Sequence, residues 1–152
     1  MKRRPDGRTL ADQIAGECVM TRWRAMNRVL TAIYDEEFRP FRLKSGQLGL
    51  LVALTKAGPV RRTELGRHLS LDPSTLTRNL RVMLKNGWIK EVPDGGDQRG
   101  APLEITPKGR KLLESVGPAW HAAQTRARKM LGGEAAELVM SMSRNPRITA
   151  MR

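Results

Sequence analysis

The sequence has few of the residues that build disulfides, metal sites and membrane spans. It holds one cysteine, Cys18, and two isolated histidines, so it offers neither an internal disulfide nor a metal-ligand set. No apolar run approaches the roughly 20 residues of a membrane span. The charged start MKRRPDGR lacks the apolar stretch of a signal peptide. We therefore expect a soluble, cytoplasmic protein with no metal, no cofactor and no membrane partner.

The chain carries an excess of positive charge. Lys and Arg number 28 against 15 Asp and Glu, which gives a net charge of +13, and no single tail carries the surplus. A body this basic attracts polyanions, of which nucleic acid is the commonest and an anionic membrane surface the competitor. Aromatic residues make up only 4% of the chain, so its core must be mainly aliphatic. No catalytic arrangement or phosphate-binding glycine motif is recognisable, so we expect no enzyme.

Apolar spacing predicts a mainly helical chain. An amphipathic helix of roughly 30 residues begins at Thr9, its N-cap, and a second, capped by Ser45, stops at Gly58. A short helix spans 62–69, and another, capped by Asp72 with Pro73 at its first position, runs to Asn86. The segments WIKEV and PLEIT alternate like two strands of a hairpin. Thr106, followed by Pro107, caps a helix that runs to about 131 with a kink at 117–118, and a short helix follows.

The helix over 73–86 has two different faces. Leu76, Leu80, Met83 and Leu84 form one apolar stripe, while the opposite and flanking positions carry hydroxyls and cations. A solvated surface is the plain interpretation. However, residues 73–90 contain no carboxylate, and the helix follows a short helix after a tight turn. In helix-turn-helix proteins the second helix enters the DNA major groove, so we interpret this segment as a recognition helix.

The loop between the two predicted strands, PDGGDQRGA, carries one strong cation. A thin hairpin tipped with Arg99, braced by Asp97, suits a narrow minor groove, whose potential attracts guanidinium groups. An ordinary surface hairpin with an Asp–Arg pair is the alternative.

Residues 64–113 resemble the winged-helix core of the MarR family of bacterial regulators, and the resemblance extends over roughly residues 10–142. The matching pieces are Glu64-Leu65, Leu69, Ser74-Thr75-Leu76-Thr77-Arg78, Gly87-Trp88-Ile89, Asp94, Asp97-Gln98-Arg99, Leu103, Thr106 and Gly109. The resemblance implies a single domain over 1–152. In it, a winged helix-turn-helix at 45–106, with a two-stranded β-hairpin wing, is flanked by dimerisation helices at 9–44 and 107–145.

The resemblance also implies a function. Such proteins are homodimers that bind double-stranded DNA at pseudo-palindromic operators, repress nearby genes and are often released by small phenolic or anionic effectors. Its implied DNA contacts are Ser74, Thr75, Thr77, Arg78 and Arg81, with Asp97 and Arg99 in the wing. A winged-helix architectural or protein-interaction module without an operator is the alternative function.

Two further sets of residues are candidates for sensing. Cys18 lies where redox-sensing members of the family place a reactive cysteine, although its apolar stripe favours a small buried hydrophobe. Arg22, one turn on, is positioned to lower its pKa. Trp23, Met26 and Trp120 are candidate linings of an effector cavity, and ordinary core packing is their alternative role.

Overall fold

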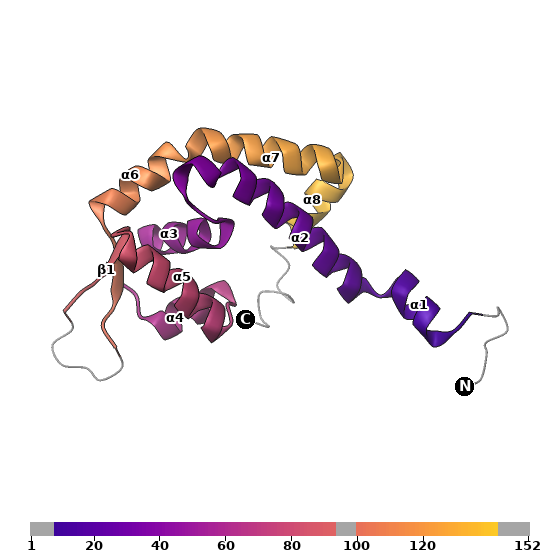
Figure 1. Ribbon diagram of the computed structural model, residues 1–152, viewed down its shortest axis with the longest axis horizontal. Helices are drawn as coiled ribbons and strands as arrows, with labels where there is room; N and C mark the ends of the chain where they lie inside the picture. Colours follow the sequence, from indigo (N-terminus) through magenta and orange to yellow (C-terminus); the bar gives the residue numbers. More distant parts are fainter. Residues whose placement is uncertain (1–7, 94–99, 143–152) are drawn as a thin grey trace.

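The computed structural model describes residues 8–93 and 100–142 and is mainly helical (Figure 1). In chain order the elements are α1 (Leu10–Glu17), α2 (Val19–Glu37), a 3-10 turn η1 (Arg39–Phe41), α3 (Ser45–Ala57), α4 (Arg62–Leu69), α5 (Pro73–Lys85), β1 (Ile89–Glu91), β2 (Leu103–Ile105), α6 (Pro107–Ser115), α7 (Gly117–Leu131) and α8 (Gly133–Met142). Within these two stretches no helix is both long and apolar enough to cross a membrane.

The helices α3, α4 and α5 and the hairpin enclose the main core. Its most deeply buried side chains include Leu50, Leu54, Leu65, Leu80 and Leu103, each at most 1% exposed. The strands β1 and β2 are antiparallel, with Ile89 opposite Ile105. The segment before α4 joins this sheet through a single bridge between Val60 and Leu103. The predicted helix-turn-helix followed by a hairpin is confirmed.

Local capping explains where several of these elements begin. The Asp72 carboxylate accepts a hydrogen bond from the Thr75 amide, with Pro73 at the first helical position of α5. The Thr106 hydroxyl accepts from the Gly109 amide and donates to the Gly87 carbonyl, so it caps α6 and ties α6 to the end of α5. Both predicted caps are confirmed.

The predicted cap at Ser45 is wrong. Lys44 is the N-cap of α3, and its amide donates to the Gln47 side chain over 3.0 Å. Ser45 already lies inside the helix, where its amide donates to Asp35 Oδ1 at 2.7 Å. The Asp35 carboxylate, on α2, therefore accepts the hydrogen bond of a backbone amide at the start of α3. A side chain next to the helix start usually fills this role.

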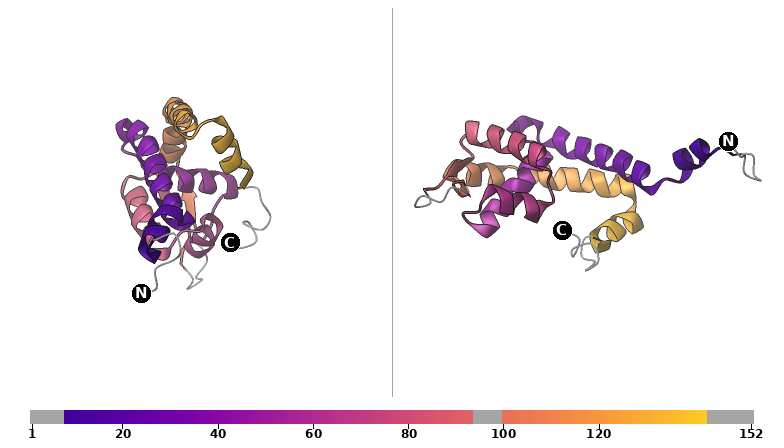
Figure 2. Two further views of the ribbon diagram at one scale, coloured as in Figure 1. Left: turned by 90° about the vertical axis from the view of Figure 1, so that its right-hand side faces the viewer. Right: turned by 90° about the horizontal axis from the view of Figure 1, so that it is seen from below.

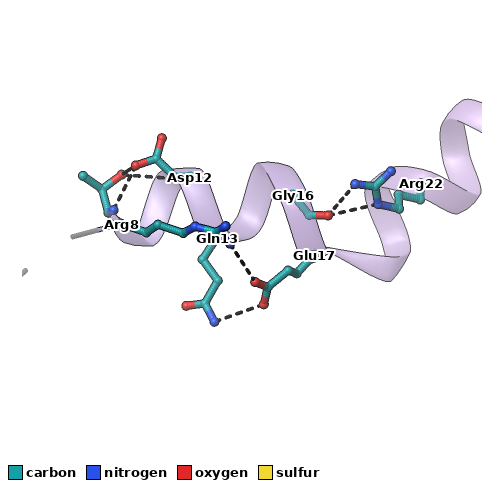
Figure 3. A network of polar contacts seen from close by, with 7 residues as sticks. Arg8, Asp12, Gln13, Gly16, Glu17 and Arg22 are labelled. Atoms are coloured by element: carbon teal, nitrogen blue, oxygen red, sulfur yellow. Dashed lines mark hydrogen bonds and ion pairs between the residues drawn. The ribbon is translucent and has the colours of Figure 1, made fainter. Parts of the chain in front are cut away.

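The predicted unbroken helix of roughly 30 residues is also wrong, because Cys18 interrupts it. The Cys18 backbone is extended (φ −69°, ψ 112°) and separates α1 from α2. In a continuous helix the Gly16 carbonyl would accept from the amide of residue 20. Here it accepts from the Arg22 guanidinium instead, and Gly16 is itself a poor helix former (Figure 3).

The kink predicted at Gly117 and Pro118 is found as a break one residue earlier, at Val116. The helix α6 ends at Ser115, and α7 begins at Gly117 with Pro118 in its first turn. The helix α7 then lies beside α2, as Figures 1 and 2 both show, and α8 folds back against α7. The Arg126 guanidinium on α7 pairs with Glu36 (2.8 Å) and Glu37 (2.6 Å) on α2, which joins the two long helices.

Candidate nucleic-acid interface

The helix α5 has one buried side and one open side. Leu80 and Met83 are fully buried and Leu76 is 7% exposed, so the apolar stripe holds the helix against its domain. Asn79 lies at the edge of this stripe, half-buried, and its side-chain amide donates to the Thr75 carbonyl within the helix. The predicted division of the helix into a core face and a polar face is confirmed.

The side chains predicted to contact DNA lie mostly on the open side. Ser74, Thr77, Arg78 and Arg81 are exposed, whereas Thr75 is half-buried. Since Arg78 and Arg81 are three residues apart, their side chains leave adjacent turns of one face. They present two guanidinium groups, which match the paired acceptors on a guanine edge or a phosphate.

The Ser74 hydroxyl is not a free donor. It donates to Asp72 Oδ1 at 2.6 Å, so its proton is used inside the N-terminal cap of α5. Together with the Thr75 groups, this contact holds the pKa of the Asp72 carboxyl well below its usual range. Asp72 is thus a charged cap at the helix start, and the first carboxylate after it in the sequence is Glu91.

The hairpin is described at its base only. Asp97 and Arg99, the two residues predicted to contact DNA from the wing, lie outside the described residues. At the base, the Arg62 guanidinium donates to the Glu91 carboxylate at 2.6 Å, and the Arg61 guanidinium donates to the Gly100 carbonyl at 2.7 Å. Sequence reasoning missed these contacts because they join residues 29 and 39 positions apart.

The three candidates for an effector cavity do not come together. Trp120 lines an open groove of about 640 Å³ between α2, α3 and α7, and it also borders a smaller cavity of about 210 Å³. Trp23 and Met26 line neither space and are 49% and 36% exposed. They are not core residues within one chain, and an effector cavity that includes them stays a prediction. Tyr34 also lines the groove, and burial raises the pKa of its hydroxyl.

Cys18 is half-buried at the junction of α1 and α2 rather than part of a buried stripe. The Thr21 side chain and then its backbone hold the pKa of the Cys18 thiol below its ordinary value. Arg22, proposed from the sequence as the neighbouring cation, is turned toward the Gly16 carbonyl instead (Figure 3). No group of three or more histidine, cysteine, aspartate or glutamate side chains suited to a metal occurs in the described part of the chain.

Three helices, α1, α2 and α8, carry exposed apolar side chains, and we call this set of side chains the arm face. Its members are large apolar side chains that the single chain leaves exposed: Leu10, Ile14, Val19, Met20, Trp23, Met26, Val29, Leu138, Met140 and Met142. In Figure 1 and in the right-hand view of Figure 2, α1 projects away from the rest of the molecule. Exposed apolar side chains in this number make the arm face a candidate contact site for a partner.

Comparison with known proteins identifies relatives of this architecture. A model of the MarR family matches residues 43–100. The multiple antibiotic resistance protein MarR of Salmonella typhimurium is 30% identical over 89 residues, which cover 59% of this chain and 62% of that protein. The chain thus spans about three fifths of the length of this curated relative.

Solved structures share the fold over a longer stretch. A probable transcriptional regulator from Pseudomonas aeruginosa superposes with a TM-score of 0.74 at 23% identity, covering 84% of this chain and 96% of that one. A mutant MarR from E. coli complexed with operator DNA gives 0.73 at 20% identity, covering 90% and 97%. The predicted winged-helix fold and the resemblance to the MarR family are confirmed.

Proposed function

We propose that this MarR-like chain is a sequence-specific DNA-binding transcription regulator, a repressor that acts as a homodimer on a pseudo-palindromic operator. The observation that carries the proposal is the open face of α5. It presents Arg78 and Arg81 from a helix whose other side is locked in the core. A rigid helix with two exposed guanidinium groups, set after a tight turn, is what major-groove reading requires.

Each side chain has a distinct proposed role at the DNA. Arg78 and Arg81 read guanine edges or adjoining phosphates, and the exposed Thr77 hydroxyl donates to a base or a phosphate. Thr75 and Ser74 contact DNA at the start of the helix. The Ser74 hydroxyl can act there only as an acceptor, because it donates its proton in a hydrogen bond to Asp72. Asp97 and Arg99 belong to the wing, which we propose contacts the neighbouring minor groove.

The arm face supports the homodimer. A second copy of the chain has the same exposed apolar side chains, and a two-fold interface brings identical patches together. Two copies present two α5 helices, which suits half-sites one turn of DNA apart, about 34 Å. Burying Val19 and Trp23, which are 80% and 49% exposed in one chain, supplies the apolar contact that such an interface needs.

Selection of bound sequences from random DNA tests the regulator function. We expect one palindrome to be enriched and to bind at least about 10³-fold more tightly than random DNA. Arg78→Ala should cut that ratio by about 10- to 100-fold, because a guanine contact contributes roughly 1–3 kcal/mol. Arg110→Ala is the matched control, since it removes the same charge from an exposed position on α6. Binding without any enriched sequence would instead support an architectural module.

A small phenolic or anionic effector is a second part of the proposal. The groove beside Trp120 has apolar walls from α2 and α3 together with hydroxyls such as Tyr34 and Thr31, a composition that suits an aromatic ring with a polar substituent. Titration of the operator complex with hydroxybenzoates should release the DNA. Trp120→Ala should weaken that release, while Lys129→Ala, at an exposed position of α7 outside the groove, should leave it unchanged.

Redox sensing through Cys18 is the alternative form of regulation. The lowered pKa and partial exposure of its thiol favour the reactive thiolate. An organic peroxide should then release the wild-type protein from its operator and leave Cys18→Ser bound. Equal release of both proteins would reject this alternative.

A further inference from the structure

Two consecutive arginines connect the first turn of α4 to both limbs of the hairpin. Arg62 pairs with Glu91 at the end of β1, with 2.6 Å between Nη2 and Oε1. Arg61 donates from Nη1 to the carbonyl of Gly100, on the limb that returns to β2. Between these contacts, Val60 and Leu103 exchange two backbone hydrogen bonds of 3.0 and 2.9 Å. The segment 60–62 therefore holds the hairpin base at three points.

Electrostatics alone does not account for this arrangement. Exposed arginines beside a DNA-binding helix usually contact phosphates, but both guanidinium groups here donate to acceptors of the hairpin itself. Glu91 ends a stretch of 18 residues, 73–90, that contains no carboxylate. A carboxylate at the hairpin base repels DNA, so its presence there is explained by its contact with Arg62 rather than by any attraction to the nucleic acid.

We propose that Arg61, Arg62 and Glu91 form a wing brace, a set of positioning residues that sets the angle of the hairpin relative to α4. The inference rests on the proposed function, because the angle determines where along an operator the hairpin meets DNA beside the site that α5 reads. The brace raises the ratio of operator affinity to random-DNA affinity. It holds the hairpin in the one orientation that the operator complex needs, whereas binding to random DNA does not depend on that orientation. Arg61, Arg62 and Glu91 do this without contacting a base.

Substitution of Glu91 separates the brace from simple charge effects. Glu91→Gln removes one negative charge and so raises the net charge of the protein by one. Electrostatics alone therefore predicts tighter binding to every DNA sequence. The brace predicts that the ratio of operator affinity to random-DNA affinity falls about threefold, the scale of an exposed ion pair. Arg62→Gln should lower the ratio by a similar factor. The double variant should lower it no further, since both changes break one contact.

The pair Lys90–Glu104 provides the matched control. It crosses the same two strands at 2.9 Å, but it links the strands to each other and not to α4. Glu104→Gln makes the same charge change as Glu91→Gln on the same hairpin, so it should leave the affinity ratio unchanged. The brace is overturned if Glu91→Gln also leaves the ratio unchanged. It is equally overturned if Arg62→Gln weakens operator and random DNA alike and reduces the salt slope by about one, as loss of a phosphate contact would.

Amide hydrogen exchange tests the brace without DNA. The Leu103 amide donates to Val60, next to the two arginines, whereas the Thr106 amide donates to Trp88 at the other end of the hairpin. Arg62→Gln and Glu91→Gln should each speed exchange at Leu103 about threefold and leave Thr106 unchanged. Unchanged exchange at Leu103 would overturn the brace. If the wild-type protein selects no operator, the regulator function fails while the exchange rates still decide whether the brace exists.

Discussion

The winged-helix module and the arm face use the same kinds of side chain in opposite ways. In the module, Leu50, Leu65 and Leu80 are at most 1% exposed, because α3, α4, α5 and the hairpin cover one another. On the arm face, Leu10 is 65% and Leu138 is 59% exposed. An amphipathic pattern therefore shows that a helix needs a partner, but it does not show whether the partner lies in the same chain.

The two regions also differ in how their helices are held. All eight residues of α1 are described and none is buried, and the polar contacts in Figure 3 lie within α1, at the residues just before it and at the start of α2. In contrast, α5 is anchored by apolar side chains from several elements. Stability should therefore be lost through substitutions in the module, and association between chains through substitutions on the arm face.

The largest effect is expected at Gly109, where α6 packs against the module. A Cβ atom there would lie 2.1 Å from the Trp88 carbonyl oxygen, and a backbone atom has little freedom to move aside. Gly109→Ala should lower the free energy of unfolding by about 3 kcal/mol or more, measured by urea denaturation. Gly133→Ala is the control, because nothing lies within 4 Å of its Cβ position. Equal stability of the two variants would show that α6 can shift away from β1.

A charge on the arm face should separate the chains and leave the fold intact. Trp23→Asp places a carboxylate at a site that is 49% exposed in one chain, so its circular dichroism should match the wild type. If Trp23 lies in the core of the interface, the dissociation constant of the dimer should rise at least about 30-fold, which corresponds to 2 kcal/mol. Sedimentation equilibrium measures this change. Arg24→Ala on the same helix should have little effect, and a Trp23→Asp protein that remains dimeric would contradict the proposed interface.

The cap of α5 should make stability depend on pH. The pKa of Asp72 is held below its ordinary value of 3.8, chiefly by the Ser74 hydroxyl. The stability that the carboxylate contributes is therefore fully present above the unfolded pKa and is lost as pH falls through the folded pKa. The melting temperature of Asp72→Ala should lie a few degrees below wild type at pH 7, and the gap should narrow below pH 3.8. A constant gap would contradict the charged cap.

The smallest effect is expected where α2 and α7 meet. Arg126 holds the pKa of Glu36 below its ordinary value of 4.5, so this contact also weakens as pH falls below that value. Arg126→Gln should lower the melting temperature slightly at neutral pH, and added salt should shrink the difference because both partners are exposed. Lys129→Gln, which removes an equal charge from α7, is the control. A difference that is unaffected by salt would contradict an ionic contact.

Local signals predicted much of the module. The faces of α5 followed from residue spacing, and the caps at Asp72 and Thr106 followed from groups three residues apart. The break before Gly117 followed from the Gly-Pro pair. These features depend on interactions within one or two turns, so the order of residues is enough to determine them. The same residues carried the resemblance to the MarR family, and with it the expected fold.

Only the tertiary structure decided the features that depend on distant partners. Asp35 on α2 replaced Ser45 as the group that satisfies the start of α3, and Arg126 on α7 paired with Glu36 and Glu37 on α2. Trp120 came to line a groove whereas Trp23 was left open, although both are tryptophans on amphipathic helices. The sequence by itself determined which face of α5 is apolar and where α5 and α6 begin, because those are short-range properties of the chain. Which face meets which partner depends on packing between elements far apart in sequence, and spacing along the chain does not encode that directly.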